Sequence, residues 1–171
     1  MPISAEDLLH GTTPANLSAS TPDSGWIAGG DFLREAQLTD IGFAALSSRL
    51  CVVFDLRNAL DFPDADIAVI VLNHVREFSW LGSGTAQSYQ PWLVMNAEFA
   101  RNDGWHQVGM ALMPNQDFSV ACSSVEFFAG RSDLYDQAPP DLTEASAEEI
   151  EAGFPRVSTT FVVDDYFRLD S

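Results

Sequence analysis

The chain has 171 residues, of which 46% are hydrophobic and 11% aromatic. This length and composition are typical of one globular domain, residues 1–171, with its own core and not of a disordered chain. Its 25 acidic residues face eight arginines and no lysine, and the formal charge of −17 disfavours binding to nucleic acids and anionic membranes. The same charge would speed encounter with a basic protein.

Residues 1–37 are the least regular part and are predicted to form an N-terminal arm. Ser4 and Asp7 have the spacing of a capping box, which predicts a short helix that Gly11 ends. Residues 12–24 are rich in Ser, Thr and Pro and predict an extended surface segment. The start of the chain lacks the basic and apolar regions of a secretory signal, so a cytoplasmic location is expected.

Residues 38–130 carry the alternation that is typical of β-strands, and residues 49–80 are its centre. In residues 49–57 the large apolar side chains fall on one face, whereas Asp55 and Arg57 fall on the other. Residues 67–72 are apolar on both faces and predict the most buried strand. A shift of the pattern near Asn73 predicts a β-bulge.

Further strands are predicted along the rest of this region. Residues 41–45 pair with 50–56 as a hairpin, and Asp103-Gly104 predicts a tight turn between strands at 92–99 and 105–112. Two more runs, at 117–122 and 125–128, also alternate. Together these runs predict an antiparallel meander of about six strands.

Residues 131–171 are predicted to form a helix and an acidic tail. Asp141 and Glu144 have capping-box spacing before the helix formers of residues 145–152, and Gly153 ends the helix. Residues 161–163 predict an edge strand. The expected fold is therefore α+β, mainly β: an antiparallel sheet with a short C-terminal helix.

The sequence gives little support for a metal site or a catalytic site. Asp61, Asp64 and Asp66 lie on one loop, but the loop lacks the glycine and the later glutamate of a calcium site, which favours a solvated turn. Ser83 lies between two glycines without the strand and helix of a hydrolase elbow. No metal, cofactor or catalytic residue is predicted.

Histidines and cysteines are also scarce. The imidazoles of His10, His74 and His106 lie in separate elements without zinc-site spacing. Cys51 and Cys122 lie in predicted strands and are expected to be buried, reduced thiols. A pair between Cys122 and His106 on neighbouring strands stays open as an alternative, because sequence does not fix such proximity.

A protein-binding surface is the remaining interpretation. Polar residues of the strands around Asp55 and Arg76 form either cross-strand pairs on a solvated face or the rim of a binding face. Tryptophan would be the anchor of such a face, although at least two of Trp80, Trp92 and Trp105 are expected in the core. The predicted partner-binding residues are Asp55, Arg57, Asp61, Asp64, Asp66, Arg76, Glu77 and Trp80.

Four stretches, at residues 54–57, 75–80, 126–130 and 150–155, resemble a known class of proteins in general character. Over roughly residues 38–163 the chain resembles small, acidic, β-rich bacterial immunity proteins, the antidotes to polymorphic or type VI secreted toxins. The resemblance implies a non-catalytic cytoplasmic protein that binds a toxin and occludes its active site. It implies no particular functional residues, because no shared motif marks them.

Three functions follow from these patterns. The first is an immunity protein that binds a cognate, basic toxin through its carboxylates. The second is a scaffold that assembles through exposed strand edges, and the third is a small-ligand binder or enzyme that uses the interior of a curled sheet.

Overall fold

The computed structural model describes residues 1–14, 17–18, 33–82 and 90–170. The elements in this part of the chain are β1 (Ile3–Ser4), α1 (Ala5–Leu9), β2 (Gln37–Ala44), β3 (Arg49–Asp55), β4 (Ile67–Asn73), β5 (Glu77–Gly82), β6 (Trp92–Asn102), β7 (Trp105–Met113), β8 (Gln116–Cys122), β9 (Ser124–Ser132), α3 (Ala147–Gly153) and β10 (Thr160–Leu169). Most of the predicted segment 12–24 falls outside the described residues.

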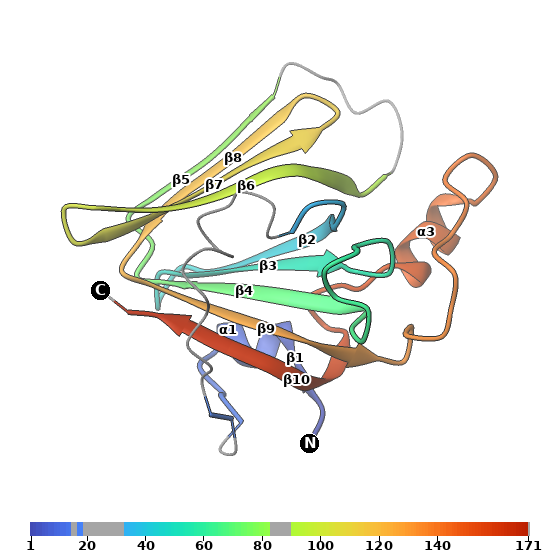
Figure 1. Ribbon diagram of the computed structural model, residues 1–171, viewed down its shortest axis with the longest axis horizontal. Coiled ribbons are helices and arrows are strands. Elements are labelled where there is room, and N and C mark those ends of the chain that lie inside the picture. Colours follow the sequence, from blue (N-terminus) through green and yellow to red (C-terminus); the bar gives the residue numbers. More distant parts are fainter. Residues whose placement is uncertain (15–16, 19–32, 83–89, 171) are drawn as a thin grey trace.

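All ten described strands belong to one antiparallel sheet, which confirms the mainly β prediction (Figure 1). Their order is β1-β10-β9-β4-β3-β2-β6-β7-β8-β5. The prediction of a meander of about six strands is wrong in count and in order. β9 returns to pair with β4 along its whole length, and β10 pairs with β9, so the centre of the sheet is built from pairings that are distant in the sequence.

The sheet bends between two consecutive pairs of strands. β4 pairs with β9 and β5 pairs with β8, and the chain turns sharply between β4 and β5, where His74 has a φ of 51°. The bulge predicted near Asn73 is therefore a break between two strands. The corner stays hydrogen-bonded, because Arg76 N donates to Ala121 O at 2.8 Å and Ser123 N donates to Asn73 O at 2.9 Å.

The bend folds the half that contains β5, β6, β7 and β8 over the rest of the sheet (Figure 1). One core cluster joins both halves and includes Phe54 and Ile70 below with Phe118 and Val120 above. A second cluster covers the other face of β3, β4 and β9 with α1. All residues of β4 are buried for this reason, which confirms the prediction for residues 67–72.

Local signals are confirmed where one short motif decides the structure. The hydroxyl of Ser4 accepts from Asp7 N at 3.1 Å, and the Asp7 carboxylate accepts from Ser4 N at 3.0 Å, so the predicted capping box starts α1. Asp103 and Gly104 both have positive φ, 50° and 80°, in the hairpin between β6 and β7. β2 and β3 form the predicted hairpin.

The C-terminal prediction is correct only in outline. α3 is capped by Ser146, whose hydroxyl accepts from Glu149 N, and not by Asp141, which instead accepts from Thr143 in a turn. The helix is also not terminal. β10 follows it and pairs with β9 from Phe161 to Leu169, so the edge strand predicted at 161–163 is longer and lies between β1 and β9.

Candidate functional site

Asp55 and Arg57 form a buried ion pair, not a pair on a solvated face. The Asp55 side chain is 1% exposed and that of Arg57 is 6% exposed, with Arg57 Nη2 2.6 Å from Asp55 Oδ2. Alternation placed them correctly opposite Phe54 and Leu56, but that face is covered. Their prediction as surface contacts is therefore wrong.

The covering segment is held by Arg57 itself. Its guanidinium donates to Gln137 O at 3.1 Å and to Gly153 O at 2.6 Å, and it lies over the ring of Phe154. One side chain thus fastens both ends of the stretch 137–153 to the body of the protein.

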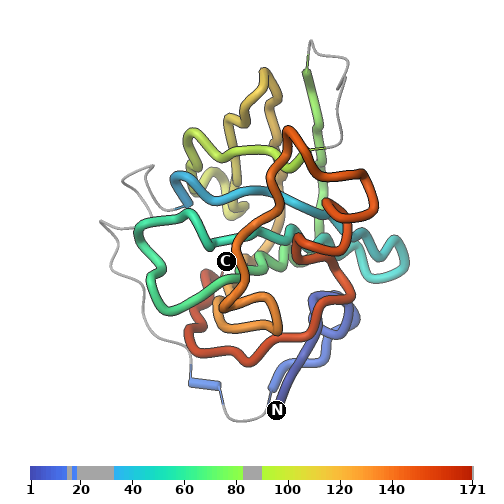
Figure 2. Tube along the Cα trace, turned by 90° about the vertical axis from the view of Figure 1, so that its right-hand side faces the viewer, coloured from blue at the N-terminus to red at the C-terminus, as the bar shows by residue number. Residues whose placement is uncertain are grey.

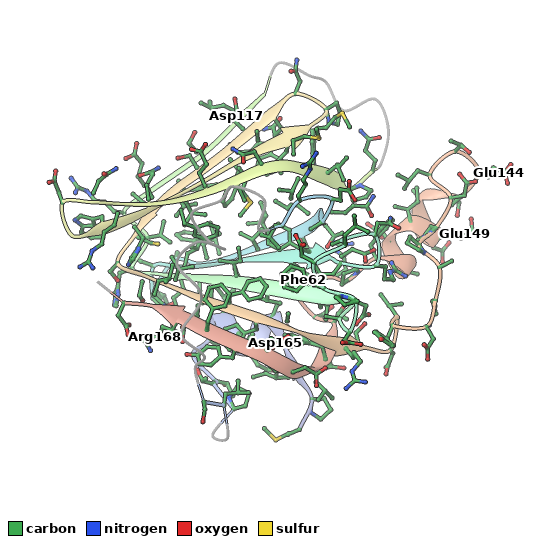
Figure 3. The ribbon with its side chains drawn as sticks, viewed as in Figure 1. Phe62, Asp117, Glu144, Glu149, Asp165 and Arg168 are labelled. Carbon is green, nitrogen blue, oxygen red and sulfur yellow. The ribbon has the colours of Figure 1, made fainter. Side chains whose placement is uncertain are left out.

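We call residues 133–153 the acidic arm. No basic residue lies between Arg131 and Arg156, and the arm carries seven exposed carboxylates (Figure 3, where Glu144 and Glu149 are labelled). They belong to Asp133, Asp136, Asp141, Glu144, Glu148, Glu149 and Glu151. The Thr143 hydroxyl lowers the pKa of Asp141, and the backbone N–H of Ser146 lowers that of Glu149. Both carboxylates therefore stay charged well below neutral pH.

The loop at residues 56–66 extends this acidic surface. It lines one hollow together with residues 135–139, so the loop and the start of the arm lie side by side (Figure 2). Asp61 and Asp64 are exposed and share a shallow hollow with Arg131, Asp164 and Asp165. We call the four aspartates of this hollow the acidic rim, and the arm and rim together the acidic end.

Asp66 is not part of that surface. It is 2% exposed, and its carboxylate accepts hydrogen bonds from the backbone N–H and the hydroxyl of Ser132. Asp66 therefore fixes the loop to the end of β9, and its prediction as a surface contact is wrong.

Arg76, Glu77 and Trp80 lie far from the acidic end. β4 separates them from the 56–66 loop, and seven residues of strand span about 20 Å. Arg76 and Glu77 are exposed, and the Arg76 guanidinium lies 5.4 Å from the ring centroid of Trp105. Trp80 is half-buried against Trp92, with 5.6 Å between ring centroids. The eight predicted residues therefore do not form one surface.

His106 and Cys122 lie directly opposite each other on β7 and β8. The imidazole Nε2 is 3.1 Å from the carbonyl oxygen of Asp170, and Cys122 is fully buried. Burial raises the pKa of Cys122 to about 12 and that of Cys51 to about 11. Neither thiol is poised to act as a thiolate nucleophile at neutral pH.

We expect native protein to resist thiol reagents at pH 8, with both cysteines reacting only after denaturation. The raised values also make stability pH-dependent: it is complete below about pH 9, and is lost as the pH rises towards 12 because the unfolded thiols ionise first. Urea unfolding should show a decrease of roughly 2 kcal/mol between pH 8 and pH 10. A Cys51→Ala, Cys122→Ala variant should lack most of this slope. Rapid native labelling at pH 8 would contradict the assignment.

The described part of the chain has neither a metal-binding group of side chains nor a membrane-spanning helix. No group of three or more His, Cys, Asp or Glu side chains there is arranged to hold a metal ion. Among the same residues, no helix has the length and apolarity that crossing a membrane requires.

The carboxylates of the acidic arm were not among the predicted partner-binding residues. Their signal was nevertheless present in the sequence, as seven acidic residues and no basic one between Arg131 and Arg156. Sequence alone placed them on a helix and tail and gave no reason to join them to Asp61 and Asp64.

No protein-family model matches the chain, and no curated protein matches it. Among solved structures, the chain is similar to a crystal structure of an uncharacterized protein from Neisseria gonorrhoeae. The two are 11% identical, the match covers 55% of this chain and 90% of that chain, and the TM-score is 0.43. A likeness at this level indicates no function.

Proposed function

We propose that this protein is an immunity-type inhibitor that binds a basic protein toxin in the cytoplasm and blocks its active site. The observation that carries the proposal is the acidic arm, which has seven exposed carboxylates and no basic residue of its own and is fastened to the body by Arg57. The protein acts by binding and performs no catalysis.

Charge and preorganisation of the acidic arm both favour binding of a basic partner. A concentrated patch of one sign steers a partner of the opposite sign and raises the association rate. Because Arg57 fixes the arm at both ends, less of its conformational freedom remains to be lost on binding. Carboxylates in this arrangement would occupy the basic cleft in which a toxin otherwise holds its anionic substrate.

The partner for the first test is the product of the gene adjacent to the one that encodes this chain. Expressed alone it should arrest growth, and co-expression of this protein should restore it. If the adjacent product binds and is toxic yet remains toxic in the complex, inhibition is ruled out. If it does not bind, the immunity proposal fails.

Neutralising the acidic arm should slow association with that partner about tenfold at low salt, because the steering charge is removed. The variant replaces four carboxylates whose side chains take part in no helix cap or ion pair with other described residues: Asp133→Asn, Asp136→Asn, Glu144→Gln and Glu148→Gln. Stopped-flow rates for the unmodified protein should also fall steeply between 20 and 200 mM salt.

A control variant has the same net charge of −13, four units less negative than the −17 of the unmodified protein. It separates the effect of where the charges lie from the effect of how many there are. It carries Glu77→Gln, Glu98→Gln, Asp103→Asn and Asp117→Asn, all on β5 to β8 or their hairpin. Its association rate should change less than about threefold. Equal slowing of both variants would assign the effect to net charge alone, and slowing of the control only would move the binding surface to β5 to β8.

A further inference from the structure

A row of polar side chains crosses the end of the sheet opposite the acidic arm. Arg49 of β3, Asn73 of β4, Glu126 of β9 and Arg168 of β10 come from four adjacent strands. They lie near one end of the face that α1 covers, within one side-chain repeat of each other, because Asn73 is paired with Ser124, and Glu126 is paired with both Val71 and Arg168. Across the middle of β3, β4 and β9 this face is apolar.

These residues line a hollow of about 660 Å³. Arg76, His74 and Trp105 lie on its wall. Three of the eight arginines of a chain with a formal charge of −17 therefore gather at one place, about 20 Å from the acidic end. Arg168 is labelled in Figure 3, away from Glu144 and Glu149.

The arginines of the hollow differ in what they already bind. Arg168 is engaged, since its Nε lies 2.5 Å from Asp170 Oδ1 and its Nη1 lies 3.7 Å from Glu126 Oε1. Arg49 makes no ion pair within the described ranges of the chain, and Arg76 has there only its contact with the Trp105 ring. Among the described residues, no carboxylate neutralises these two guanidinium groups, so both can bind an anion.

Asn73 supplies an independent indication of a ligand. It is 5% exposed, and its Nδ2 donates to Glu126 Oε2 at 2.9 Å and to Ser124 Oγ at 3.2 Å. Its Oδ1 is buried and has no hydrogen-bond partner among the described residues. A buried acceptor without a donor is costly, so the side chain is matched to a ligand that brings a donor.

From this polar hollow we infer that the protein binds a small hydroxylated organic anion. The carboxylate or phosphate of the ligand is held by Arg49 and Arg76, whose planar guanidinium groups suit either oxyanion. A ligand hydroxyl donates to Asn73. The volume is within the range of small-molecule sites, and the mixed lining of arginine, asparagine and tryptophan suits a ligand that is partly charged and partly polar.

Four probes separate the parts of this inference in calorimetric titrations of the full chain at pH 7 and low salt. Ribose 5-phosphate and gluconate carry hydroxyls with a phosphate or a carboxylate, inorganic phosphate carries only the charge, and ribose only the hydroxyls. At least one hydroxylated anion should bind at least about tenfold more tightly than inorganic phosphate, and ribose should not bind. The stronger of the two hydroxylated anions identifies the oxyanion.

Variants then locate the binding. Arg49→Met and Arg76→Gln should each weaken the best probe about tenfold or more, whereas Arg101→Gln, near the exposed end of β6, removes the same charge and should leave affinity unchanged. Circular dichroism confirms that each variant is folded. The inference is overturned if neither hydroxylated anion binds at 10 mM, or if folded Arg49 and Arg76 variants bind like the unmodified protein.

Discussion

An Arg57→Met variant should be less stable than the unmodified protein by about 4 kcal/mol. The change removes the cation and leaves the Asp55 carboxylate, which is 1% exposed, buried without its ionic partner. It also removes the hydrogen bonds to Gln137 O and Gly153 O that hold the two ends of the covering segment. The expected result is a lower midpoint in urea and faster proteolytic cleavage within residues 133–153 than elsewhere.

Two comparisons make the result specific. In an Asp55→Asn, Arg57→Met variant the buried charge is gone, while the amide oxygen of Asn can still accept the hydrogen bond from residue 57 N, so much of the lost stability should return. Arg131→Met breaks an exposed pair with Asp164 and should change the midpoint little. An Arg57→Met protein that unfolds at the normal urea concentration would show that the pair does not hold the arm.

Asp55 shows which structural features the sequence predicts and which it does not: the face of the strand was predicted correctly, but the burial of that face was not. Alternation along residues 49–57 assigned the faces of the strand correctly, because it depends only on backbone geometry. Whether the second face meets water depends on residues 137–153, about 80 positions later, which come back to cover it. A distant segment that covers the strand leaves no pattern in the sequence near Asp55, so the prediction placed this charged side chain in solvent.

Distance along the sequence also separates the elements that were predicted correctly from those that were missed. The capping box at Ser4 and the turn at Asp103-Gly104 are decided within four residues. The pairing of β4 with β9 is not decided by neighbouring residues. The polar row is not either, because its members come from β3, β4, β9 and β10. No spacing rule joins Arg49 to Arg168, although the sheet brings both to one hollow.

Gly130 offers a test of the junction between the sheet and the acidic rim. It lies on β9 opposite Val163, next to the bulge that separates Val163 from Asp165, and its carbonyl oxygen accepts from Asp66 N at 3.0 Å. A Cβ built at Gly130 would overlap the backbone carbonyl of Val162, which has no flexible end that could move aside. Gly130→Ala should therefore lower the free energy of unfolding by about 3 kcal/mol.

Gly109→Ala is the matched control, because it makes the same substitution in β7 where nothing lies within 4 Å of the added carbon. There, the loss of freedom in the unfolded chain should leave stability unchanged or raise it by about 0.5 kcal/mol. Urea unfolding compares the two. Since β10 must shift to admit the methyl group, Gly130→Ala should also displace the acidic rim at Asp164 and Asp165 and weaken partner binding, while Gly109→Ala should not. Equal stability of the two variants would mean that the bulge yields without cost, and the close approach of β9 and β10 would then have no part in fixing the rim.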